Sequence, residues 1–154
     1  MNDESFLYKK FPPSEPCSCP ICLNFCKRPG WWTLCEARKA IDSGFARRMM
    51  LEISPERIFG VLSPAFKGNE GNYALQIFAD QGCTFLHNNL CEIYGSGFQP
   101  IECRYCYHNR KNMGIKCHSE IEKEWNSEAG KRLIVEWGNK IGFWNRQGFI
   151  LQEK

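Results

Sequence analysis

The chain has 154 residues, which suits one compact domain, and 43% of them are apolar, which allows a modest core. The net charge of +3 is too small to indicate a nucleic-acid partner. No apolar run approaches the roughly 18 residues that a membrane helix needs. Ten cysteines are the outlier. The start of the chain, MNDESFLYKK, has acidic residues and no apolar run, so we expect no signal peptide and a cytoplasmic protein. Thiols stay reduced in the cytoplasm. Many cysteines in such a protein indicate metal or redox chemistry.

The first cysteine cluster follows residues 1–16, which end in FPPSEP and are predicted to form an extended N-terminal arm. Its spacing is C-x-C-x2-C-x3-C, at Cys17, Cys19, Cys22 and Cys26. Disulfides between such near neighbours are geometrically difficult, whereas thiolates can surround one cation. A thioredoxin-like C-x-x-C lies between a strand and a helix, but a proline-rich loop precedes this one, which favours metal.

The next segment combines a helix start with an apolar stripe. Thr33 and Glu36 form a capping box that predicts a helix of about 34–50. Cys35 lies one step off the stripe and is interpreted as a buried thiol rather than a ligand. The residues predicted to face the core are Leu34, Ala37, Ile41 and Phe45, preceded by the core residues Trp31 and Trp32.

The middle of the chain predicts three short elements. Ser54-Pro55-Glu56 is an N-cap with proline at the first helical position, so a short helix is expected after it. Residues 64–72 form a glycine-rich loop that lacks the residue order of a phosphate-binding loop. Residues 73–79 (YALQIFA) indicate a strand that is covered on both faces.

The second cysteine cluster, residues 82–118, also contains all three histidines. Residues 83–86 and 90–94 predict a hairpin around a tight turn at 87–89, in which Cys83 and Cys91 are diagonal neighbours. Pro100 can begin a helix that places Cys103 and Cys106 on one face, near an N-terminus that favours thiolates. Cys117 and His118 close the cluster.

The tail predicts two helices. Residues 119–126 suit a short helix with Ile121 and Trp125 paired. Ser127 caps a longer helix from Glu128 to about residue 139, and Gly142 ends that region. The buried stripe of the longer helix is predicted to contain Ala129, Leu133 and Trp137, with Ile134 and Ile141 beside it.

These motifs together carry a resemblance. The order C-x-x-C-x-x-x-C, then C-T-F-L-x4-C-E-I-Y, then P-I-E-C-R resembles the YkgJ-like cysteine-cluster family of zinc- or iron-chelating proteins, over residues 19–26 and 82–106. The resemblance implies that Cys19, Cys22 and Cys26 act with Cys83, Cys91 and Cys103. The chain departs from the family at Lys27, where a second, adjacent cysteine is common, and at Gln99-Pro100, where Arg-Pro is common, so the number and the partition of the ligands stay open.

Coordination chemistry limits how these cysteines can be used. Zinc sites built from cysteine are four-coordinate, so the eight cysteines other than Cys17 and Cys35 would fill two such sites or one polynuclear iron–sulfur centre. One partition places Cys19 and Cys22 with Cys103 and Cys106, and Cys26 with Cys83, Cys91 and Cys117. His118 can replace one cysteine, His108 is the next candidate, and His87 is interpreted as solvated. A metal-free role as buried thiols is the remaining alternative.

We therefore predict a small α+β domain over residues 1–154, with several helices around a short hairpin or sheet, stabilised by metal that joins the two cysteine clusters. The expected function is metal binding, with Zn²⁺ or iron as the cofactor and an unassigned biochemical role. An iron–sulfur redox protein and a metal-dependent enzyme are alternatives; for the enzyme, Glu92, Glu102 and Arg104 are candidate groups beside ligands. The basic pairs Arg47-Arg48 and Arg110-Lys111 lack the aromatic interleaving of nucleic-acid surfaces, and a protein partner stays open.

Overall fold

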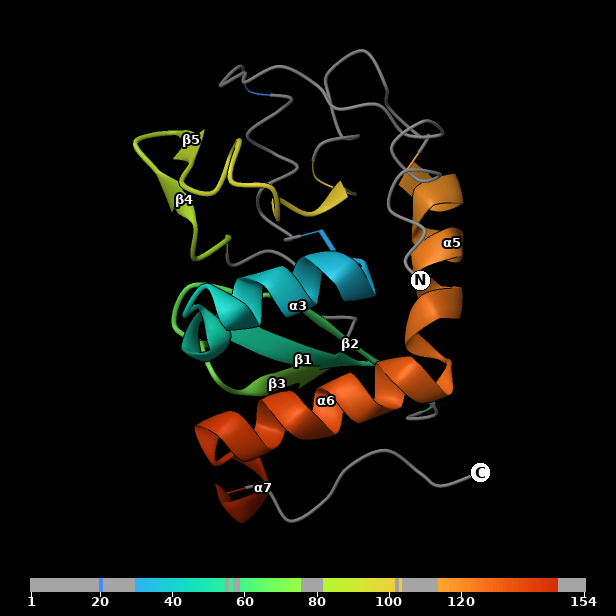
Figure 1. Cartoon of the computed structure of the whole chain (residues 1–154). Coiled ribbons are helices and arrows are strands. Elements are labelled where there is room, and N and C mark those ends of the chain that lie inside the picture. The colour runs from blue at the N-terminus through green and yellow to red at the C-terminus, as the bar shows by residue number, and fades with distance from the viewer. Residues whose placement is uncertain are drawn as a thin grey trace.

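The computed structural model describes residues 20, 30–54, 56, 59–75, 82–101, 103 and 114–146, and the expected α+β class is confirmed. The elements in chain order are α3 (Leu34–Asp42), η1 (Ala46–Arg48), β1 (Met49–Ile53), β2 (Gly60–Pro64), β3 (Tyr73–Leu75), β4 (Leu86–His87), β5 (Leu90–Cys91), α5 (Gly114–Trp125), α6 (Glu128–Ile141) and α7 (Phe143–Arg146). Helices α3 and α6 lie along a three-stranded sheet, and the β4–β5 hairpin lies beyond α3, away from α6 (Figure 1). Within the described ranges no helix has the length and apolar character needed to cross a bilayer. The predicted arm at 1–16 falls outside them.

Helix α3 begins where the sequence predicts and ends earlier. The Thr33 hydroxyl accepts from the Glu36 N–H at 3.1 Å, and the Glu36 carboxylate accepts from the Thr33 N–H at 3.0 Å, which completes the capping box. The helix ends at Asp42, and Gly44 follows with a φ of +94° that glycine adopts readily. The prediction of a helix to about residue 50 was therefore wrong, because residues 49–53 pair with other strands instead.

The main sheet has the order β2-β1-β3, with β1 antiparallel to β2 and parallel to β3. Strands β1 and β2 are buried along their whole length. A short helix was expected after Ser54, but the described residues there show a turn at Glu56 and then β2. Ser54 donates its N–H to the Phe59 carbonyl at 3.0 Å and accepts from the Phe59 N–H at 3.3 Å, which closes the β1–β2 connection.

Strand β3 confirms the start of the predicted strand at 73–79, and residues 76–79 fall outside the described ranges. The expectation that both faces are covered was wrong for Tyr73, which is 38% exposed. Strand β1 shows the alternation of a covered strand more clearly. Met49, Leu51 and Ile53 join the main core, whereas Met50 packs with Ala65 and Phe66 in a second, smaller cluster. The sheet is therefore covered on both sides at its central strand.

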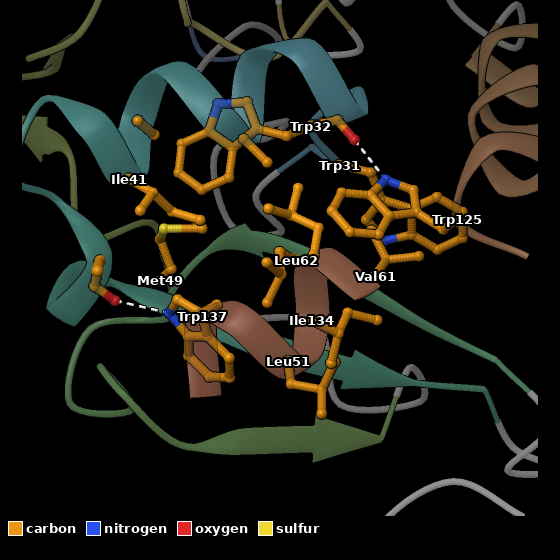
Figure 2. Packing of buried hydrophobic residues seen from close by; sticks show 14 of the residues in the cluster. Trp31, Trp32, Ile41, Met49, Leu51, Val61, Leu62, Trp125, Ile134 and Trp137 are labelled. Carbon is orange, nitrogen blue, oxygen red and sulfur yellow. Dashed lines mark hydrogen bonds between the residues drawn. The ribbon is translucent and has the colours of Figure 1, made fainter. Parts of the chain in front are cut away.

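Tryptophans fill the space between the helices and the sheet (Figure 2). Trp31, Trp32, Trp125 and Trp137 are at most 1% exposed, which confirms the core role predicted for the first two. Each buried indole N–H has an acceptor, as burial of a polar group requires. Trp125 donates to the Trp32 carbonyl at 2.6 Å, and Trp137 donates to the Ala46 carbonyl at 2.8 Å. The indole of Trp31 donates to the buried carboxylate of Glu52 at 2.6 Å.

The C-terminal helices follow the sequence signals closely. Ser127 caps α6 by accepting from the Gly130 N–H at 3.2 Å, and Gly142 ends the helix with a φ of +75°. Ile121 and Trp125 of α5 are fully buried, as predicted. The buried stripe of α6 contains Leu133, Ile134, Trp137 and Ile141. Ala129 was wrongly assigned to that stripe: it is exposed, and Gly130 is buried one position later, where a Cβ atom would lie 2.6 Å from the Trp125 carbonyl oxygen.

Candidate metal centre

The predicted metal ligands fall into three groups in the structure. Cys83, Cys91 and Cys103 have described side chains. Cys117 and His118 lie in the N-terminal half of α5, where the backbone is described. The predicted ligands Cys19, Cys22, Cys26 and Cys106 fall outside the described ranges, as do Glu102, Arg104 and His108. The surroundings of the sulfur atoms are therefore described for Cys83, Cys91 and Cys103.

Cys83 lies in an extended bridge rather than in the predicted hairpin. It pairs with Phe66 in an antiparallel bridge, and Thr84 donates its N–H to the Ala65 carbonyl at 2.9 Å. Its side chain is 9% exposed, and its sulfur accepts from the Phe85 N–H at 3.4 Å. Cys83 itself is thus paired with the residues that directly follow β2, and not with β5.

Cys91 ends the second strand of a smaller hairpin than the sequence predicted. Strands β4 and β5 have two residues each, and Cys91 pairs with Leu86. The turn contains only Asn88 and Asn89, with φ values of +51° and +64°, the paired positive angles of a type I′ turn. His87 is part of β4 instead of the turn. The predicted register, with Cys83 and Cys91 as diagonal neighbours in one hairpin, was therefore wrong.

The two segments still lie side by side. Leu86 donates its N–H to the Cys83 carbonyl at 3.0 Å, and Glu92 donates its N–H to the Phe85 carbonyl at 2.7 Å. Backbone hydrogen bonds thus connect the residues around Cys83 to the residue after Cys91. We name residues 82–103 the cysteine segment, with residue 102 outside the described ranges.

Cys103 is held from the start of α3. Ile101 and Cys103 have helical backbone, which agrees with a helix beginning near Pro100. The sulfur of Cys103 accepts from the Gly30 N–H at 3.2 Å, across 73 residues of sequence. The buried carboxylate of Glu36 accepts from the Ile101 N–H at 3.1 Å as well as from the Thr33 N–H. Glu36 therefore caps α3 and the helical turn that carries Cys103, and only the first of these roles was visible in the capping-box pattern.

Three charged or titratable side chains, Arg48, His87 and Glu92, lie together beside the chain between Cys83 and Cys91. Arg48 makes two hydrogen bonds of 2.9 Å to the Glu92 carboxylate, and His87 Nε2 lies 3.0 Å from the same carboxylate. The hydrogen bonds from Arg48 hold the pKa of Glu92 below its ordinary value, and the charges of Arg48 and His87 act in the same direction. The pKa of Arg48 is raised, chiefly by Glu92 and also by the nearby Cys83 and Glu70. His87 is 59% exposed at the side chain, in agreement with the solvated position expected for it.

The arrangement determines what the described residues can bind by themselves. Cys35, Cys83, Cys91 and Cys103 are present as thiols rather than in disulfides. Among the residues with described side chains, no group of three or more histidines, cysteines, aspartates or glutamates is placed to share one ion. Each site of the predicted partition draws at most two cysteines from this part of the chain, so both would need ligands from the remaining cysteines. Comparison with known proteins found no matching family model, no matching curated protein and no matching solved structure.

Proposed function

We propose that this protein binds zinc or iron through cysteine thiolates of residues 19–26 and 83–117, as the YkgJ-like pattern implies. The observation that carries the proposal is the hydrogen bond from the Gly30 N–H to the sulfur of Cys103. The proposed ligands are Cys19, Cys22, Cys26, Cys83, Cys91, Cys103, Cys106 and Cys117, with His118 able to replace one of them.

The hydrogen bond to sulfur supports a thiolate at Cys103. A neutral thiol is a weak acceptor, and a charged acceptor makes hydrogen bonds roughly twice as strong as a neutral one. Hydrogen bonds to sulfur also tune metal–thiolate centres. The Phe85 N–H makes the same kind of contact to Cys83, at 3.4 Å. Both Cys83 and Cys103 therefore accept a backbone N–H, which suits sulfurs that are to carry charge.

The same hydrogen bond relates the two cysteine clusters. Cys26, the last cysteine of the first cluster, precedes Gly30 by four residues in the sequence. Four residues of chain span at most about 14 Å. Since Gly30 contacts the Cys103 sulfur directly, this tether limits the distance that a site shared between the clusters would need to close. Soft thiolate ligands at such positions suit zinc and iron.

The contacts of Glu92 favour a structural role for this residue over a catalytic one. Its carboxylate is occupied by both terminal nitrogens of Arg48 and is near His87. A general acid or base needs to reach a substrate proton, and a carboxylate held by a bidentate arginine is stabilised in its charged form. We therefore propose a chelating or structural role, in which bound metal contributes to folding.

The test is metal analysis of protein purified without oxygen, together with its absorbance spectrum. We expect metal in the wild type: colourless protein with one or two zinc ions per chain, or coloured protein containing iron and sulfide. Cys103→Ala should lose metal, because it removes a ligand whose sulfur is already held in place. Cys35→Ala is the matched control, since Cys35 is a half-buried thiol on α3 outside the proposed set. Wild type without metal, or equal metal content in Cys103→Ala and wild type, would contradict the proposal.

A further inference from the structure

Arg48 is placed where two separate parts of the cysteine segment meet. It is the last residue of η1, directly before β1, and its backbone carbonyl accepts from the Ala65 N–H at 3.1 Å. Its backbone therefore extends the pairing of β1 with β2 by one residue, beyond the Met49–Pro64 pair. Its side chain is 30% exposed, so the guanidinium is partly removed from solvent.

The guanidinium contacts the residue that follows each of two proposed ligands. One of its terminal nitrogens, Nη2, donates to the Thr84 carbonyl at 2.9 Å, and Thr84 follows Cys83. The same nitrogen and Nη1 donate to the Glu92 carboxylate, both at 2.9 Å, and Glu92 follows Cys91. A single side chain thus connects the neighbours of both cysteines to the sheet.

Stacking fixes the orientation of this group. The Arg48 Cζ atom lies 4.4 Å from the centroid of the Phe85 ring, within the range of a cation–π contact, and 5.8 Å from that of Phe45. Phe85 is fully buried, so its ring provides a fixed surface. A planar fork that stacks on a ring and binds a carboxylate with two nitrogens is a geometry that lysine cannot reproduce.

We propose that Arg48 is a positioning residue for the metal site: it sets the relative placement of Cys83 and Cys91 by holding Thr84 and Glu92 with one guanidinium. This inference rests on the proposed metal-binding function. Groups that orient metal ligands typically alter metal affinity by roughly 10–100-fold when they are removed.

The experiment measures Zn²⁺ affinity by competition with a chromophoric chelator in wild type, Arg48→Met, Arg48→Lys and Arg38→Met. Arg38 is the matched control, because it also makes a two-nitrogen contact with a glutamate, Glu136, but on the α3–α6 surface. We expect both Arg48 variants to bind Zn²⁺ about tenfold more weakly or worse, and Arg38→Met to bind as wild type does. The thiolate-to-metal charge-transfer band of the Co²⁺-loaded variants at saturation should keep the wild-type intensity, because no ligand has been removed.

Each other result overturns the inference in a distinguishable way. Wild-type affinity in Arg48→Lys would show that charge alone is sufficient and the fork is not needed. Equal weakening in Arg48→Met and Arg38→Met would show general destabilisation. Should Arg48→Met not fold, Glu92→Gln replaces it, with weaker Zn²⁺ binding expected and wild-type affinity contradicting the proposal. Wild-type affinity in Arg48→Met together with metal loss in Cys103→Ala would reject the role of Arg48 and leave the proposed function standing, whereas wild type without metal would reject both.

Discussion

The sheet with α3 and α6, which we call the core region, and the cysteine segment are built by different means. In the core region, two five-residue strands are buried throughout, and the two helices begin at side-chain caps. In the cysteine segment the strands have two residues each, and Gly82, Asn88, Asn89, Gly95 and Gly97 have positive φ angles. Strands this short, paired only with each other, are marginally stable in water.

The cysteine segment is instead held by side chains that reach it from residues 32–48. The Trp32 indole donates to the Phe98 carbonyl at 2.5 Å, the Glu36 carboxylate accepts from the Ile101 N–H, and Arg48 binds Thr84 and Glu92. Residues 32–48 therefore serve two purposes. Some of their side chains fill the core, and others hold the cysteine segment, which has little regular structure of its own. Substitutions in the core region should therefore show whether the stability of the fold and the binding of metal can be changed independently.

The largest effect is expected for Trp137→Ala. Trp137 is fully buried, and its indole N–H donates to the Ala46 carbonyl in η1, so truncation should reduce the free energy of unfolding by about 3–5 kcal/mol. Metal content should stay at the wild-type value while the protein is folded, because the hydrogen bond of Trp137 to Ala46 and its ring contact with Phe143 both lie outside the cysteine segment. Urea unfolding and metal analysis on the same samples measure both quantities.

Val135→Ala is the control for this experiment, since Val135 is on the same helix and 50% exposed. Its effect on the free energy of unfolding should be within about 0.5 kcal/mol. Folded Trp137→Ala that has lost its metal would show that the core region and the cysteine segment are not separable.

An intermediate effect is expected for Glu36→Ala, which should reduce both the stability of the fold and the affinity for Zn²⁺. The buried carboxylate accepts from both the Thr33 and Ile101 N–H groups, so removing it should cost about 2–3 kcal/mol of unfolding free energy. Because Ile101 precedes Cys103 by two residues, Zn²⁺ binding should weaken as well. Both are measured, by urea unfolding and by chelator competition.

Thr33→Ala provides the comparison for Glu36→Ala. It removes the hydroxyl that accepts from the Glu36 N–H and leaves the carboxylate contact to Ile101 available, so a cost of about 1 kcal/mol is expected, with Zn²⁺ affinity unchanged. If Thr33→Ala weakened Zn²⁺ binding as much as Glu36→Ala did, the link through Ile101 would not be the cause.

The features that could be predicted from the sequence are those fixed by neighbouring residues. The caps at Thr33 and Ser127 and the helix end at Gly142 depend on side chains within a few positions, and the structure has them where the sequence places them. The same holds for the buried pair Ile121 and Trp125, one helical turn apart. The α+β class followed from recognising these local elements.

The features that could not be predicted depend on distant partners. Residues 49–53 are apolar apart from Glu52, a run that suits a helix as well as a strand, and pairing with β2 and β3 makes them a strand. Arg48 was noted only as half of a basic pair, because its partners Thr84 and Glu92 lie 36 and 44 positions away. The predicted hairpin register of Cys83 and Cys91 failed for a similar reason, since Cys83 pairs with Phe66 rather than within its own segment.

The smallest effect is expected for Glu136→Gln, which removes the surface counterpart of the Arg48–Glu92 pair. The hydrogen bonds from Arg38 lower the pKa of Glu136, so the pair stabilises the fold above the ordinary pKa of a carboxyl group and loses this contribution as the pH falls through the lowered value. Both side chains are about half exposed (44% and 54%), which limits the contribution to roughly 0.2–0.5 kcal/mol. Urea unfolding of wild type and variant should therefore differ by this small amount at pH 7 and coincide in acid. Two pairs with the same bidentate contacts would then differ because of what they touch: the Arg38 pair joins two helices that the core already holds together, whereas Arg48 holds the cysteine segment, and a large loss of stability or of Zn²⁺ affinity in Glu136→Gln would remove that distinction.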